Sequence, residues 1–62
     1  MYTSLKDNAI NHGLKFVKQE GYEHQKVMQY ILEEYDKSLL DMTEDQKYEF
    51  CHDVADKIEE LI

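Results

Sequence analysis

Cys51 and His52 are the side chains best suited to nucleophilic chemistry, and they are neighbours in the sequence. Nucleophilic catalysis by cysteine requires a base that faces the thiol within hydrogen-bonding reach. Adjacent residues on a helix point about 100° apart around its axis, so these two side chains cannot readily face each other. We therefore expect Cys51 to be a buried structural thiol, and we predict no catalytic residue and no enzyme activity.

The three histidines have no metal-binding motif in their spacing. His12 falls beside the outer face of one amphipathic segment and His24 near the start of the next, where partly exposed polar residues are expected. His52 has Asp56 and Glu49 within one helical turn, but any acidic helix offers such carboxylates. The sequence therefore predicts neither a metal site nor a cofactor.

Carboxylates recur every three or four residues in the last part of the chain, on what would be one face of a helix. This stripe consists of Asp45, Glu49, Asp53, Asp56 and Glu60. Like charges at this spacing destabilise an isolated helix by a few tenths of a kcal/mol per pair. The stripe is either a solvated face that keeps a small protein soluble or a surface complementary to a basic partner. Carboxylates about 5.4 Å apart would also imitate a run of nucleic-acid phosphates.

The net charge of −7 is unevenly distributed along the chain. Residues 1–21 carry three lysines and two carboxylates, whereas residues 22–62 carry four lysines and twelve carboxylates. Affinity for phosphates comes mainly from lysine and arginine, and the chain has no arginine. Direct binding to nucleic acid or to a membrane surface is therefore disfavoured. The charge pattern instead predicts another protein with a basic surface as the partner.

Apolar residues recur at helical spacing through nearly all of the sequence, which contains no proline and only two glycines. This pattern predicts an all-α fold, a small three-helix bundle with helices at about 4–20, 22–40 and 44–62. Sixty-two residues allow one domain, spanning 1–62. A lone cysteine fits a reducing compartment, and neither a membrane span nor a signal peptide is recognisable, so we expect a cytoplasmic protein.

Capping residues mark the predicted ends of these helices. Ser4 or Thr3 would cap the first helix, and Gly21 would end it. Thr43 and Gln46 have the spacing of a capping box at the start of the third. The predicted core stripe of the third helix is Tyr48, Cys51, Val54, Ala55, Ile58, Leu61 and Ile62.

Gly13 lies four residues after Ala9, near the middle of the apolar face of the first helix. Glycine in the middle of a helix costs about 0.5–1 kcal/mol relative to alanine, so another interaction should offset it. We expect another helix to approach closely at this point, with a functional hinge as the alternative.

Several apolar residues fall on predicted outer faces. Tyr30 lies on the polar face of the second helix, which also carries Glu33, and Leu40 lies near the end of that helix. Phe50 flanks the core stripe of the third helix. Isolated exposed apolar residues need no explanation, but aromatic residues beside a charged rim also serve as interface anchors. At least one tyrosine among Tyr2, Tyr22, Tyr30 and Tyr48 is expected to be accessible.

These features favour a non-enzymatic protein-binding module. Its predicted contact residues are Asp45, Glu49, Asp53, Asp56, Glu60, Glu33, Tyr30 and Phe50. In type, although not by a motif, the chain resembles the small acidic inhibitors that bacteriophages encode against host enzymes. That resemblance implies occupation of a basic, nucleic-acid-binding surface of a host or defence protein. The alternative is a structural or adaptor protein that homodimerises through apolar contacts centred on Tyr30, Leu40 or Phe50.

Overall fold

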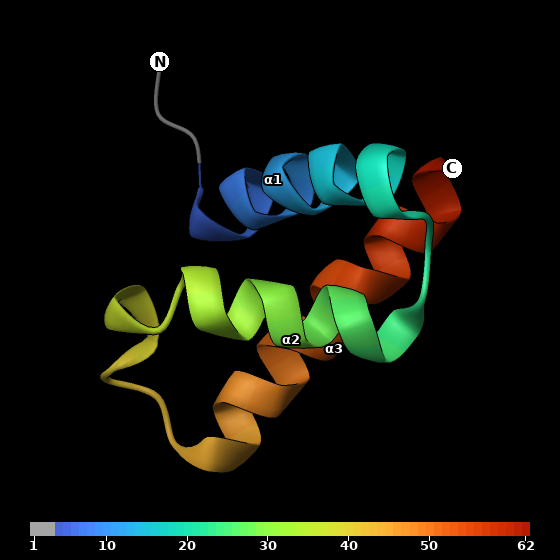
Figure 1. The fold of residues 1–62 in the computed structure, drawn as a ribbon. Helices are drawn as coiled ribbons and strands as arrows, with labels where there is room; N and C mark the ends of the chain where they lie inside the picture. The colour runs from blue at the N-terminus through green and yellow to red at the C-terminus, as the bar shows by residue number, and fades with distance from the viewer. Residues whose placement is uncertain (1–3) are drawn as a thin grey trace.

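The computed structural model describes residues 4–62 and confirms the all-α three-helix bundle (Figure 1). α1 spans Leu5–Glu20, α2 spans His24–Glu34, the short 3-10 helix η1 spans Lys37–Leu39, and α3 spans Glu44–Leu61. Over the described residues there is no strand, and no helix is long and apolar enough to cross a membrane.

α1 and α2 run side by side in opposite directions, and α3 crosses behind both of them (Figure 1). Each helix packs against the other two, so a single core lies between all three. The buried apolar side chains of this core are Ala9, Val17, Val27, Ile31, Tyr35, Leu39, Cys51, Val54, Ala55 and Ile58. No buried side-chain nitrogen or oxygen within residues 4–62 lacks a hydrogen-bond partner.

The second helix is shorter than predicted, because it ends at Glu34 and not near residue 40. Tyr35 leaves the helical conformation, with φ −110° and ψ 14°. In the following turn, the Leu39 N–H donates to the carbonyl of Tyr35 at 3.0 Å. Leu39 is fully buried as a result, whereas Leu40 is 70% exposed. Residues four apart share a face in a continuous helix, so the apolar spacing from Tyr35 to Leu39 could not reveal this break.

The predicted caps of α1 and α3 are confirmed. The Ser4 side chain accepts a hydrogen bond from the Asp7 N–H at 3.1 Å. At the start of α3, Thr43 Oγ1 accepts from the Gln46 N–H at 3.2 Å, and Gln46 Oε1 accepts from the Thr43 N–H at 3.0 Å. This reciprocal pair satisfies two amide groups that the helix itself leaves free. Thr3, the alternative cap for α1, lies outside the described residues.

Gly21 and Gly13 have separate structural roles. Gly21 follows α1 with a φ of 84°, a backbone conformation that residues other than glycine rarely adopt. The prediction that Gly21 ends the first helix is therefore confirmed. Gly13 is buried, and a Cβ added there would overlap Ile58 Cδ1 and lie 3.6 Å from Ile31 Cδ1. The close packing predicted at Gly13 is therefore confirmed, because its missing side chain leaves room for residues of α2 and α3.

Gly13→Ala is expected to lower the free energy of unfolding by about 1 kcal/mol, because overpacking of the core outweighs the gain in helix propensity. In an Ile58→Val background, which lacks the Cδ1 atom, the same substitution should be neutral or stabilising. Urea denaturation of the four proteins of this double-mutant cycle measures the difference. An equal effect of Gly13→Ala in both backgrounds would show that contact with Ile58 does not set its cost.

The core stripe predicted for α3 is only partly buried. Cys51, Val54, Ala55 and Ile58 are in the core, but Tyr48 is 64% exposed, and Leu61 and Ile62 are 55% and 61% exposed. The prediction was wrong for these three residues. α3 crosses the other two helices at an angle (Figure 1), so neither its first nor its last turns are covered.

Candidate functional site

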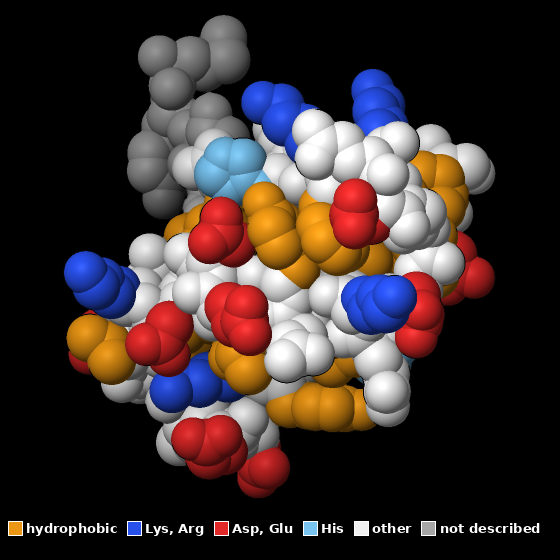
Figure 2. Space-filling model, viewed as in Figure 1, with side chains coloured by type: hydrophobic (Ala, Val, Ile, Leu, Met, Phe, Trp, Pro, Cys, Tyr) orange, Lys and Arg blue, Asp and Glu red, His pale blue; other side chains and the backbone are white. Residues whose placement is uncertain are grey.

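The carboxylates of the predicted stripe all lie exposed on α3. The acidic face is defined by Asp45, Glu49, Asp53, Asp56 and Glu60. The side of the molecule formed by α1 and α2 has a different character, since lysines, carboxylates and apolar side chains are interspersed on it (Figure 2). The five carboxylates of the acidic face, in contrast, follow one helix at spacings of three or four residues.

Nearby side chains partly neutralise the acidic face. Two of its carboxylates have such contacts, Asp53 with Lys6 at 3.4 Å and Glu60 with Lys57 at 3.4 Å, and Asp56 lies 3.2 Å from the imidazole of His52. The two lysine pairs are about half exposed or more, and exposed ion pairs contribute about 0–1 kcal/mol. Asp45 and Glu49 form no ion pair with any residue from 4 to 62. The negative charge is thus least compensated near the start of α3.

An apolar groove of about 370 Å³ lies between α2 and α3. Its apolar lining consists of Met28, Leu32, Tyr48 and Cys51, and Gln29, Glu44 and Lys47 also line it. Tyr48 in addition lines a second hollow together with Asp45, Glu49 and His52. Tyr48 therefore borders both the apolar groove and the acidic face. It also fulfils the expectation of an accessible tyrosine, whereas Tyr2 lies outside the described part of the chain.

The other predicted apolar anchors differ in their exposure. Tyr30 is half-buried, because its ring stacks on Phe16 with centroids 4.5 Å apart and an interplanar angle of 14°. Phe50 is also half-buried and packs against the core. Leu40 and Glu33 are exposed. Of the three apolar anchors, only Leu40 projects fully from the surface, because α1 supplies a stacking partner for Tyr30 that the sequence of α2 alone could not reveal.

Cys51 is only 2% exposed, as predicted for a structural thiol. Burial raises the pKa of this thiol, which disfavours the reactive thiolate. The imidazole of His52 contacts Asp56 on the same helix. The thiol therefore contributes an apolar surface to the core and to the groove.

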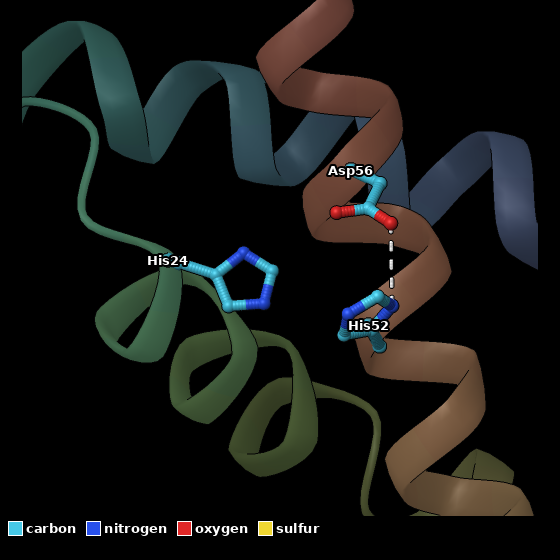
Figure 3. A group of neighbouring side chains, drawn as sticks. All are labelled: His24, His52 and Asp56. Atoms are coloured by element: carbon cyan, nitrogen blue, oxygen red, sulfur yellow. Dashed lines mark ion pairs between the residues drawn. The ribbon is translucent and has the colours of Figure 1, made fainter.

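A cluster of metal-ligating side chains forms where the first turn of α2 meets the middle of α3 (Figure 3). It consists of His24, His52 and Asp56, which each offer one ligand atom within 4.8 Å of the others. The rings of His24 and His52 have centroids 5.1 Å apart and an interplanar angle of 73°. The sequence places His52 and Asp56 one helical turn apart, but it gives no sign of His24, because residues so far apart in the sequence meet only through helix packing.

The structure thus presents three candidate features, namely the acidic face, the adjoining apolar groove and the histidine–aspartate cluster. The first two share Tyr48 as a common border. The charge and the exposure of the side chains in each feature determine what that feature can bind. No protein-family model, curated protein or solved structure matches this chain.

Proposed function

We propose that this chain is a non-enzymatic protein-binding module whose acidic face contacts a basic surface of another protein. The observation that carries the proposal is the exposure of all five carboxylates of this face along α3. An 18-residue helix is about 27 Å long, enough to present charge across a typical binding surface. Complementary charge speeds the encounter with a basic partner and disfavours acidic ones.

More specifically, we propose that the basic surface of the partner normally binds nucleic acid. Clefts for nucleic acid are lined with lysine and arginine, which contact backbone phosphates. Carboxylates on successive helical turns, about 5.4 Å apart, offer such a cleft a regular row of negative charge. A protein that fills the cleft inhibits by excluding the nucleic acid. It would then act stoichiometrically against a host or defence protein, as the small inhibitors of bacteriophages do.

The apolar groove would add affinity to this electrostatic contact. Charged rims contribute mostly to association rate and specificity, whereas buried aromatic anchors carry most of the binding energy. Tyr48 is an exposed aromatic residue at the border of the acidic face. We expect Tyr48→Ala to weaken binding to the partner by about 10- to 100-fold, measured by calorimetric titration. An unchanged affinity would restrict the contact to the charged residues.

Affinity capture at two salt concentrations tests the proposal. The purified protein is immobilised, exposed to a cell lysate and washed at about 0.1 M or about 1 M salt, between which the Debye length falls from ~10 Å to ~3 Å. Retained proteins are identified by mass spectrometry. We expect a basic, nucleic-acid-binding protein that high salt releases. Retention of partners that are indifferent to salt would contradict the electrostatic contact.

The alternative function is a structural or adaptor module that homodimerises through apolar contacts. The apolar groove favours it, because Leu32 and Tyr48 are exposed there. A second copy would bury surface that a domain of this size cannot bury alone. This alternative predicts a dimer in sedimentation equilibrium that persists in high salt and dissociates in Tyr48→Ala. A monomer at all accessible concentrations would exclude it.

A further inference from the structure

The histidine–aspartate cluster brings together ligands from two different helices. His24 is the first residue of α2, while His52 and Asp56 lie one turn apart on α3. The two imidazoles point toward each other across the space between the helices (Figure 3). No lysine belongs to this group, and both imidazoles are only partly exposed. The cluster therefore combines two imidazole nitrogen ligands with one carboxylate oxygen ligand.

The distances in this cluster are close to those of a bound ion. Zinc–nitrogen and zinc–oxygen bonds are about 2.0–2.2 Å long, so neighbouring ligand atoms on a tetrahedral zinc ion lie roughly 3.3 Å apart. His52 Nδ1 and Asp56 Oδ2 are 3.2 Å apart. Two imidazoles on one such ion would have ring centres roughly 5 Å apart, close to the 5.1 Å between His24 and His52. The three ligand atoms lie within 4.8 Å of one another, so side-chain movements of roughly 1–2 Å would bring all three onto one ion.

Tyr22 orients the imidazole of His24. Its hydroxyl lies 3.1 Å from His24 Nδ1 and 3.3 Å from a carboxylate oxygen of Glu59. Donation to the Glu59 carboxylate is the stronger, charge-assisted bond. The Tyr22 oxygen then accepts from His24 Nδ1–H, which leaves His24 Nε2 free as a ligand.

The imidazole of His52 is also held in place. It lies between His24 and the ring of Tyr48, which stacks on it with centroids 6.1 Å apart. Outer hydrogen bonds and packing of this kind fix the orientation of metal-ligating histidines in proteins. The cluster thus has supporting contacts on both imidazoles before any ion binds.

We propose that His24, His52 and Asp56 form a binding site for a divalent transition-metal ion, with zinc as its simplest occupant, that joins the start of α2 to α3. Imidazole ligands favour zinc, nickel and copper over magnesium and calcium, which prefer oxygen. Three protein ligands leave a coordination position for water. The inference does not depend on the protein-binding proposal. An ion here would supply the cross-link that a lone cysteine cannot provide.

Titration of the metal-free protein with zinc alone tests this site. Calorimetry should detect one zinc ion per chain, and a 100-fold excess of free zinc over Kd should raise the melting temperature by roughly 10 °C or more. His24→Gln and His52→Gln should each lower the affinity by at least about 100-fold, and Tyr22→Phe by about 10- to 100-fold. His12→Gln is the matched control, because it removes an imidazole outside the cluster and should leave zinc affinity unchanged.

Two results would overturn the inference. One is the absence of stoichiometric zinc binding, and the other is an equal affinity in His24→Gln, His52→Gln and His12→Gln. A nitrogen-detected NMR measurement on the unsubstituted, metal-free protein keeps the test independent of whether the variants fold. It should find the His24 proton on Nδ1. A proton on Nε2 would contradict the orientation on which the site depends.

Discussion

Replacing Leu39 with alanine is expected to lower the free energy of unfolding by about 2–5 kcal/mol, the usual cost of truncating a fully buried leucine. Leu39 is completely buried in the core, although it lies in the 3-10 helix η1 and outside the three main helices. A single small core rarely supplies more than about 3–5 kcal/mol. The variant should therefore be largely unfolded at room temperature.

Leu40→Ala is the matched control for this prediction. The two leucines are adjacent, but the Leu40 side chain is 70% exposed, so its truncation should change stability by no more than about 0.5 kcal/mol. Circular dichroism during urea denaturation compares both variants with the parent. Similar losses at the two positions would contradict the burial of Leu39 in the core and the exposure of Leu40.

Reversing two charges, in D45K/E49K, is expected to weaken binding to a basic partner by at least about 100-fold. Two attractive contacts become repulsive, and like charges juxtaposed across an interface cost several kcal/mol. Asp45 and Glu49 suit this test better than Asp53 and Asp56, because the latter contact Lys6 and His52. Calorimetric titration of the partner measures the change.

D7K/E20K controls for the change in net charge. Both double variants shift the formal charge from −7 to −3, but Asp7 and Glu20 are exposed on α1. The helix-dipole effects of these two substitutions oppose each other, since one lies in the first turn of α1 and the other at its end. The control should retain the parent's affinity. Equal losses in both variants would show that binding responds to total charge and not to the acidic face.

The local features of the fold could be predicted from the sequence. Three of these features, the apolar spacing, the caps Ser4 and Thr43, and the stop at Gly21, act through contacts within a few residues or through backbone preference. Gly13 indicates close packing because glycine in the middle of an apolar helix face needs a compensating contact, although the sequence does not name the partner. The three-helix architecture, both caps and the close packing at Gly13 followed from them. The exposure of the acidic face also followed, because it is the side of α3 opposite its core residues.

Features that depend on where the helices cross could not be predicted. Periodicity assigns Tyr48 and Leu61 to the same face as Cys51, but only the crossing angle determines how much of that face is covered. The same limit hid the stacking of Tyr30 on Phe16 and the meeting of His24 with His52. Each of these pairs joins two helices, and a single sequence contains no spacing signal for such a contact.

The most direct test of the central claim is affinity capture from one lysate with three immobilised proteins, namely the unsubstituted protein, D45K/E49K and D7K/E20K. The captured proteins are compared at about 0.1 M salt, where the Debye length is ~10 Å and charges still interact across an interface. The claim predicts a basic protein retained by the parent and by D7K/E20K but not by D45K/E49K. Capture of the same proteins by all three would contradict the role assigned to the acidic face.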